Sequence, residues 1–335
     1  MAKISQAFTT YDAKANREDL SSAIYNIDPV DTPVQTMIGR RNVSNRTFDW
    51  QTEKLPTMDT EARPEGFELL RSAAQPTVRL RNVAQINSRD ATVSGSQEAA
   101  DAAGKKSEMA HQMALASKSL KIALETIMCG TQAVSYGDQA APTRKTRAIM
   151  HWLSTNVDAP AGTVLPATED APYPTVAASR EFTEDMLGNA LQKAYDNGAQ
   201  PTKLIVRPDL KRQVSKFKGR EISQVMVGKT EVSNVVDVYA SDFGRLAVMP
   251  SRHMPLNTAL LLDPEYVAMA SYRPFFQKQM AVIGDAETRM IAIEWGIEMK
   301  NEAAHAAIIG IKAAATITPS ADAASAPTPI SSTTK

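Results

Sequence analysis

Four histidines and one cysteine are the side chains best suited to catalysis or metal binding in this chain of 335 residues. The histidines, His111, His151, His253 and His305, are far apart, and none stands in a close-spaced ligand motif. Zinc sites combine closely spaced Cys and His ligands, which a chain with Cys129 as its single cysteine does not offer. We interpret Cys129 as a small buried hydrophobic residue near a helix end. The sequence therefore predicts no metal site.

A Gly-Lys-Thr run at residues 228–230 resembles the end of a phosphate-binding loop. Such a loop needs another glycine five positions before the Gly-Lys pair, where this chain has Ser223. No Gly-x-Ser-x-Gly sequence marks a nucleophilic serine. Neighbouring carboxylates such as Glu184 and Asp185 have a simpler role at the start of a helix. We therefore predict no catalytic residues, no cofactor-binding residues and no cofactor, and we expect that the protein is not an enzyme.

The composition restricts the classes of protein that remain possible. Lys plus Arg equals Asp plus Glu at 37 each, and this neutral balance argues against a dedicated nucleic-acid-binding protein. With 43% hydrophobic residues, the chain can build one large or two ordinary domains. A single cysteine excludes an internal disulfide framework. We find no apolar run of membrane-spanning length and no signal sequence, so we expect a soluble protein of a reducing compartment.

Residues 46–93 hold the most informative pattern, because two strand-like segments flank a long loop. Apolar and polar residues alternate in both segments, which is typical of strands with one covered face; the apolar positions are Phe48 and Trp50, then Val78, Leu80, Ala84 and Ile86. Arms of this length would reach roughly 35–50 Å, beyond a body with a radius of gyration near 20 Å. We therefore expect an arm whose apolar face packs on another subunit. Its tip, residues 56–75, offers three apolar anchors: Phe67, Leu69 and Leu70.

A long helix is predicted from about residue 107 to Cys129. Apolar residues recur there every three or four positions, and Gly130 follows as a stop signal. Ser94 and Gln97 precede it as a capping box. We interpret His111 as a polar-face or subunit-contact residue of this helix, and its lysines as solvated.

Residues 150–262 have the pattern of an α/β domain. Thr183 is predicted to cap a helix that ends at Asn197-Gly198, and a strand from Lys203 to Arg207 follows. Farther on, the apolar positions of 291–299 and 303–312 alternate like strands. We expect these strands to form one sheet covered by the helix at 107–129. Residues 150–262 would then be an insertion in a discontinuous first domain.

Five segments together carry a resemblance to a known family. They are IYNIDPVDTP (24–33), TFDWQTEKL (47–55), NVAQINSRDATVSGSQEA (82–99), LDPEY (262–266) and GDAETRMIAIEWGIEMKNEAAH (284–305). The chain resembles major capsid proteins of tailed bacteriophages, in a podophage-type family with a Hong Kong 97-like fold. The matching segments fall within residues 18–312 and follow the family's order.

The resemblance implies an α+β fold of the Hong Kong 97 type. Its expected parts are an N-terminal arm (1–45), an extended loop with a β-hairpin (46–93), a peripheral domain with a long spine helix (94–149), an α/β axial domain (150–262), a peripheral-domain sheet (263–312) and a flexible C-terminal tail (313–335). The family has no catalytic residues that could be carried over, and no motif here supports covalent cross-linking between subunits.

The same resemblance implies a structural function. Hexamers and pentamers of the chain would tile an icosahedral shell around double-stranded DNA, which is packaged without sequence specificity. The partners would be other copies of the chain, with portal, scaffolding and decoration proteins, and no membrane. The location would be the virion, assembled in the cytoplasm of a bacterial host. Two alternatives stay open: an encapsulin-like compartment, and a soluble homo-oligomeric enzyme with a polar pocket in 150–262.

Overall fold

The structure is a computed structural model, and it describes residues 31–55, 60, 62–68, 76–100, 105, 107–176, 180–217, 238–282 and 284–312. Several sequence-based predictions fall outside these ranges. They are the N-terminal arm up to residue 30, Leu69 and Leu70 in the tip, the 228–230 run and the C-terminal tail.

The described residues divide into two compact units. One contains residues 88–120 and 276–292, and the other contains residues 31–87, 121–275 and 293–312. Neither unit coincides with the expected peripheral or axial domain. The division of the chain into arm, extended loop, peripheral domain and axial domain therefore stays a prediction.

The predicted long helix is confirmed as α3 (Glu108–Cys129). The short helix α2 (Gly95–Ala99) precedes it, and Ser94 caps α2 by accepting a hydrogen bond from the Gln97 backbone amide at 3.3 Å. The apolar stripe of α3 is buried at Met109, Met113, Leu120, Leu124 and Met128.

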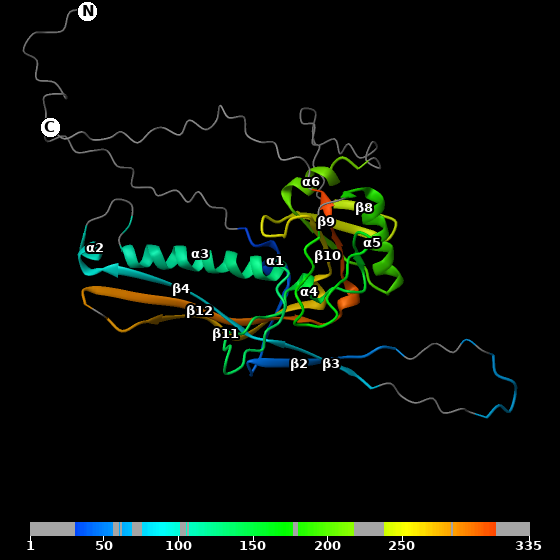
Figure 1. The fold of residues 1–335 in the computed structure, drawn as a ribbon, viewed down its shortest axis with the longest axis horizontal. Helices are drawn as coiled ribbons and strands as arrows, with labels where there is room; N and C mark the ends of the chain where they lie inside the picture. Colours follow the sequence, from blue (N-terminus) through cyan, green and yellow to red (C-terminus); the bar gives the residue numbers. More distant parts are fainter. Residues whose placement is uncertain are drawn as a thin grey trace, which may run out of the picture. The chain divides into compact units, whose positions relative to one another are not determined.

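A four-stranded sheet has the order β1-β11-β12-β4. Its strands are β1 (Gly39–Asn42), β11 (Val267–Gln279), β12 (Ala286–Met299) and β4 (Gln85–Ser94). The central strand β12 is buried along its last nine residues, including Glu294 and Glu298. In the unit formed by 88–120 and 276–292, α3 runs beside β4 and β12 (Figure 1), and Met109, Val93 and Glu287 line a common cavity of about 420 Å³.

A six-stranded sheet forms the core of the other unit, with the order β5-β13-β10-β7-β9-β8. The strands are β5 (Val157–Asp158), β13 (Ala306–Ile309), β10 (Thr258–Leu262), β7 (Lys203–Val206), β9 (Gly244–Pro250) and β8 (Val238–Ser241). Helices α5 (Glu184–Asp196) and α6 (Pro208–Val214) pack on it. Leu187, Leu191 and Leu210 from these helices share one apolar cluster with Leu204, Leu261 and Ile308 from the sheet.

The local signals predicted in this sheet domain are confirmed. The Thr183 side chain accepts a hydrogen bond from the Met186 backbone amide at 3.4 Å, which places the start of α5. Gly198 follows the helix with φ of +80°, a conformation that a residue without a Cβ adopts easily. The shorter elements of the chain are α1 (Pro33–Met37), α4 (Ile149–Trp152), η2 (Pro264–Tyr266), η3 (Glu302–Ala304), and the pair β6 (Arg180–Glu181) and β14 (Ile311–Lys312).

The expectation that 263–312 forms a single sheet is wrong for its last strands. β13 pairs antiparallel with β10, with Leu260 opposite Ala307, so it belongs to the six-stranded sheet. β14 pairs with β6 outside both larger sheets. The alternation of apolar residues defines a strand and its covered face, but it does not identify the strand's partner.

The hairpin is confirmed at its base, where β2 (Thr47–Thr52) pairs antiparallel with β3 (Val78–Val83). The second segment is not one strand, however. It breaks at the fully buried Ala84, whose amide donates to the Arg46 carbonyl at 2.7 Å, and β4 then enters the four-stranded sheet. The expected hairpin of 46–93 therefore includes a strand of another sheet.

Two glycines allow a test of this packing by the same substitution. A Cβ on Gly296 of β12 would lie 2.8 Å from the Phe48 ring and 2.9 Å from the Val83 carbonyl oxygen. A Cβ on Gly188 in α5 would meet nothing within 4 Å. We expect Gly296→Ala to lower the free energy of unfolding by about 1–3 kcal/mol through overpacking. Gly188→Ala should raise it by about 0.5–1 kcal/mol, because alanine is the better helix former.

Denaturant unfolding of both variants measures these two changes. A Gly296→Ala protein as stable as the parent would contradict the close packing of β12 against β2 and β3.

Candidate functional site

The residues suited to catalysis occupy separate structural places. His151 and His305 are buried, the His253 ring lies 3.3 Å from the Thr126 hydroxyl, and His111 is half-buried on α3. Cys129 is buried, and burial raises the pKa of its thiol, which does not favour a nucleophile. Within the described ranges, no three His, Cys, Asp or Glu side chains group as metal ligands. No helix there is long and apolar enough to span a membrane.

The base of the hairpin is covered by its own chain. Phe48 and Trp50 are 7% and 8% exposed, and the Trp50 ring lies 5.6 Å from the Trp152 ring. The Trp50 indole donates to the Met299 carbonyl at 2.8 Å. Buried Asn82 donates from its side chain to the Ile297 carbonyl at 2.6 Å. The expectation that another subunit covers this face is therefore wrong at the base.

Apolar side chains become exposed where the chain leaves that base. Val78, at the far end of β3, is 57% exposed, and Leu55 beyond β2 is 92% exposed. Phe67 in the tip is 46% exposed, with the Arg63 guanidinium 5.6 Å from its ring centre. Monomeric proteins rarely leave grouped large apolar side chains in water without a partner. The outer hairpin and its tip are thus the part of this element with surface left to bury.

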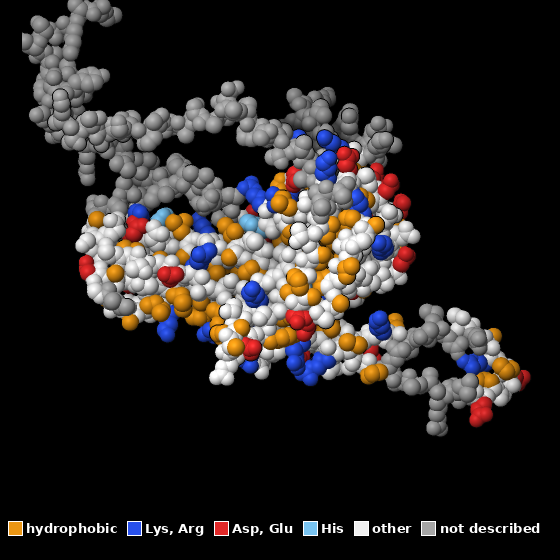
Figure 2. Space-filling model, in the orientation of Figure 1, with side chains coloured by type: hydrophobic (Ala, Val, Ile, Leu, Met, Phe, Trp, Pro, Cys, Tyr) orange, Lys and Arg blue, Asp and Glu red, His pale blue; other side chains and the backbone are white. Residues whose placement is uncertain are grey.

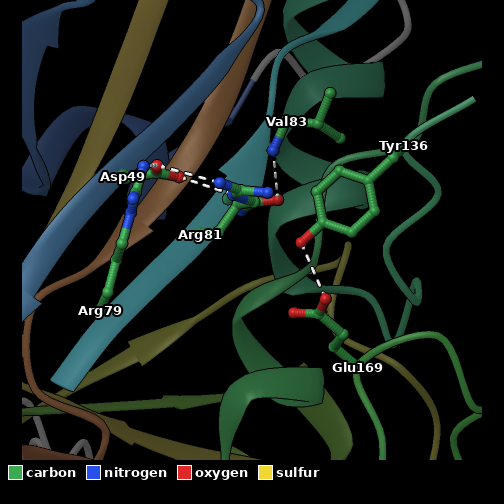
Figure 3. Close-up of polar contacts among 7 residues, drawn as sticks. Asp49, Arg79, Arg81, Val83, Tyr136 and Glu169 are labelled. Atoms are coloured by element: carbon green, nitrogen blue, oxygen red, sulfur yellow. Dashed lines mark hydrogen bonds and ion pairs between the residues drawn. The ribbon is translucent and has the colours of Figure 1, made fainter.

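Arginines surround the hairpin base. The Asp49 carboxylate on β2 lies between Arg79 and Arg81 of β3 (Figure 3), and the Arg81 Nε to Asp49 Oδ1 distance is 2.9 Å. The hydrogen bond from Arg81 lowers the pKa of the Asp49 carboxyl, so the group stays ionised at neutral pH. Arg81 stands directly opposite Asp49, and Arg79 is the next residue on the same face of β3, opposite Gln51. One carboxylate can therefore serve both arginines.

Two buried carboxylates on β12 hold further arginines. Glu294 is shared by Arg144, at 3.2 Å, and Arg273, at 2.9 Å. Glu298 accepts from Arg41 at 2.7 Å. Buried charges are tolerated when they are paired in this way. We call the six residues of this region the arginine surface: Arg41, Arg46, Arg79, Arg81, Arg144 and Arg273. Figure 2 shows Lys and Arg side chains gathered over β2 and β3.

A cavity of about 580 Å³ opens within the arginine surface. Arg46 and Arg144 line it together with Asp138 and the rings of Tyr136 and Tyr272. The Asp138 carboxylate accepts a hydrogen bond from the Ala141 backbone amide at 2.5 Å. The Tyr136 hydroxyl donates to Glu169 at 2.9 Å (Figure 3), which fixes the ring, and burial raises the pKa of that hydroxyl. Gly137 in the cavity wall has φ of +66°. Guanidinium groups beside aromatic rings suit a ligand that carries both a carboxylate and an apolar group.

The first turn of the chain after residue 31 is fixed to α3 by a buried carboxylate. Glu125 accepts hydrogen bonds from the Val34 and Gln35 backbone amides, both at 2.8 Å. Burial raises the pKa of this carboxyl, and the two amide donors oppose that effect. Glu125 thus binds the free backbone amides at the N-terminal end of α1, although it lies 90 or more positions away in the sequence.

Sequence reasoning did not identify the arginine surface or Glu125. The arginines of β3 were visible as the polar positions of an alternating strand, and this pattern gave a partial signal. Glu294 and Glu125 each contact a partner 90 or more positions away in the sequence, apart from the contact of Glu294 with Arg273. No spacing rule connects residues so far apart.

Comparison with known proteins gives a consistent family. The family model described as SU10 major capsid protein matches residues 4–312. A curated protein described as the major capsid protein of Escherichia phage Phieco32 is 30% identical over 127 residues, which is 38% of this chain and 36% of that protein. The matched region thus spans about a third of the length of this curated relative.

Solved structures share the fold at low sequence identity. The capsid of a native GTA particle has a TM-score of 0.61 at 12% identity, covering 91% of this chain and 98% of that chain. The capsid of cyanophage P-SCSP1u has a TM-score of 0.58 at 10% identity, covering 88% and 92%. The SrpI encapsulin of Synechococcus elongatus has a TM-score of 0.56 at 10% identity, covering 89% and 93%. The α+β fold is that of the Hong Kong 97-like shell proteins.

Proposed function

The chain belongs to the SU10 major capsid protein family, and on that premise we propose that its copies assemble into the icosahedral shell of a bacteriophage virion. The observation that carries this proposal is the family match over residues 4–312, which includes all of the described residues. The role is structural, and the dispersed histidines and the buried cysteine agree with it.

Assembly would proceed through hexamers and pentamers in which each hairpin lies over a neighbouring copy. The base of the hairpin is held within its own subunit by Trp50 and Asn82, so the exposed part is presented on a fixed support. An interface that buries about 1,000 Å² of apolar surface would contribute on the order of 25 kcal/mol before the costs of association. Even a large entropic cost would leave each copy bound.

The wider set of partners follows from the same proposal. Double-stranded DNA would fill the shell without sequence-specific contacts, and portal, scaffolding and decoration proteins would complete the virion. Assembly would take place in the cytoplasm of the host bacterium. Within the shell, 107–129 would be the spine helix, and 94–149 with the strands β11 and β12 would form the peripheral domain. Residues 150–262 with the strand β13, which pairs with β10, would form the axial domain.

A second candidate function is an encapsulin-like protein compartment. The likeness to the SrpI encapsulin, over 89% of this chain, favours it at the level of the fold. The two functions differ in their contents, since a phage shell holds DNA and a compartment holds protein. Nuclease-resistant DNA recovered from purified shells would favour the phage, and a single co-purifying enzyme without DNA would favour the compartment.

The basic test is the mass of the purified protein. By light scattering and electron microscopy we expect capsomers of five or six 36.3 kDa subunits, or closed shells of at least about a megadalton that contain many such subunits. A strictly monomeric protein at high concentration and moderate salt, with or without a scaffolding protein, would refute the proposal.

The tip of the hairpin provides a sharper test. Replacing residues 56–75 with a short Gly-Ser turn should leave the subunit folded, because the β2–β3 base keeps its contacts to Trp152 and Met299. The melting temperature of unassembled protein should stay within about 2 °C of the parent, equivalent to about 1 kcal/mol for a chain of this length. The yield of closed shells should fall to near zero.

Two point variants serve as a matched pair in the same assay. Phe67→Ser removes an exposed apolar side chain from the tip, and Val164→Ser removes an 81% exposed one from the loop after β5. Only the first should lower shell yield. Normal shells from the shortened protein would remove the assembly role of the tip.

A further inference from the structure

The arginine surface carries more positive charge than its own carboxylates neutralise. Five of its arginines share three carboxylates, those of Asp49, Glu294 and Glu298. Glu294 and Glu298 are buried, at 4% and 5% exposed, and Asp49 is 20% exposed. The side chains of Arg41, Arg79 and Arg81 are 50%, 64% and 51% exposed, whereas Arg144 is 16% exposed. Each guanidinium has five N–H donors, and the buried carboxylates use only some of them. The remaining donors of Arg41, Arg79 and Arg81, the exposed side chains among these, therefore face the solvent.

Arg46 adds a sixth positive charge. Its side chain is exposed, it lines the cavity beside Tyr136 and Tyr272, and it has no carboxylate within ion-pair distance among the described residues. A carboxylate from outside the subunit could therefore pair with Arg46 without displacing an internal partner. The two tyrosine rings next to it offer an apolar wall of the size that an aromatic side chain needs.

The tip of the hairpin has the complementary composition. Residues 59–68 read DTEARPEGFE, with four carboxylates against one arginine, a formal charge of −3. Glu65, Phe67 and Glu68 are all exposed. The tip thus joins an aromatic ring to two carboxylates within four residues. The cavity joins tyrosine rings to two arginines and to the Asp138 carboxylate, which the Ala141 backbone amide already holds.

We propose that the acidic tip of one copy docks on the arginine surface of the next copy, with Glu65 or Glu68 at Arg46 and Phe67 in the tyrosine-lined cavity. This inference rests on the proposed assembly of identical copies and names the surface that receives the tip. Tip and receiving surface are different parts of the same chain, so the contact is heterologous. Repeated head-to-tail, such a contact forms a ring when the rotation between successive copies closes after five or six of them, as a capsomer requires.

Charge reversal with rescue tests the contact. Glu65→Arg with Glu68→Arg places like charges together, and Arg46→Glu does the same from the other side. Each should lower shell yield at least about tenfold, because like charges in an interface are strongly unfavourable. The triple variant should recover most of the parent's yield. Arg46→Glu leaves the pairs of Asp49, Glu294 and Glu298 intact, so the subunit should melt like the parent.

A control variant tests whether the rescue is specific to the residues of the tip. Asp196→Arg with Asp242→Arg makes the same change in charge at two exposed positions of the α5–β9 region. If this double variant lowers shell yield, adding Arg46→Glu to it should not restore the yield. A triple variant no better than its worse parent, or normal shells from all variants, would overturn the proposal.

A cross-linking measurement is independent of shell closure. Glu65→Cys with Arg46→Cys, treated with a mild oxidant that takes up the two thiol hydrogens, should give a ladder of disulfide-linked oligomers on a denaturing gel. Cys129 is buried and stays as it is. The pair Glu65→Cys with Asp196→Cys should give no ladder. Oligomers without closed shells would support the contact while counting against the proposed function.

Two other results would overturn the inference. Internally cross-linked monomers would mean that the tip docks on its own subunit. Loss of DNA retention by Arg46→Glu, with normal shell yield and no ladder from the paired cysteines, would mean that the arginine surface faces nucleic acid. The salt dependence of shell yield gives a further check, because charge pairs near solvent weaken as salt increases.

Discussion

Leu120→Asp is expected to abolish folding, with the protein recovered only in aggregates. Leu120 lies in the middle of the apolar stripe of α3 and is 1% exposed. An unpaired carboxylate at such a site costs several kcal/mol, a large share of the roughly 5–15 kcal/mol that stabilises a domain. The measurement is the soluble fraction after expression, followed by thermal melting of whatever remains soluble.

The next residue of the helix provides the control. Lys121 is exposed, so Lys121→Asp should yield soluble protein that melts within a few degrees of the parent. If Leu120→Asp protein is soluble and melts cooperatively at the parent's temperature, this face of α3 is not part of the core.

Acid should destabilise the subunit through His305. This side chain is fully buried, and burial lowers the pKa of its imidazole from 6.5 to about 4. Its Nδ1 accepts a hydrogen bond from the Asp263 backbone amide at 3.1 Å, a contact that needs the neutral ring. The unfolded chain therefore binds a proton below pH 6.5, whereas the folded chain binds it only near pH 4. Stability should fall as the pH drops through this window, by up to about 3 kcal/mol from this group.

Denaturant unfolding at several pH values between 7.5 and 4 measures the effect. His305→Asn keeps an acceptor near the position of Nδ1 but cannot titrate, so its stability should depend less steeply on pH in that window. Lost packing alone would lower stability equally at every pH. A variant with the slope of the parent would show that His305 is not the titrating group. Burial also lowers the pKa of His151, so part of the slope should remain.

The arrangement around His151 explains that remaining slope. Its Nδ1 accepts from the Arg147 guanidinium at 3.0 Å, and its Nε2 lies 2.7 Å from the Ala171 carbonyl oxygen. A proton on Nδ1 would face a cation, so the folded state favours the neutral ring. The direction is the same as for His305, and the two groups act together as the pH falls.

The sequence by itself determined the elements whose signals are local. The three- and four-residue spacing of Met109, Met113, Ala116 and Leu120 defined α3. Thr183 defined the start of α5, and the alternation at Phe48 and Trp50 defined β2. These signals depend on the geometry of one helix turn or one strand, so they can be read without knowing the rest of the fold. The resemblance to the capsid family also rested on contiguous segments, and it indicated the correct fold.

Only the tertiary structure decided which elements meet. Apolar alternation marks one face of β13 or β2 but gives no partner. β13 was expected beside β12, although it pairs with β10. Phe48 and Trp50 were expected to lie under another subunit, although Gly296 lies against Phe48 and the Trp152 ring lies 5.6 Å from the Trp50 ring. The arginine surface likewise depends on the tertiary structure, because Glu294 and Arg144 are paired although 150 residues separate them in the sequence. Pairing of this kind follows from burial and charge balance over the whole fold, and no local spacing encodes it.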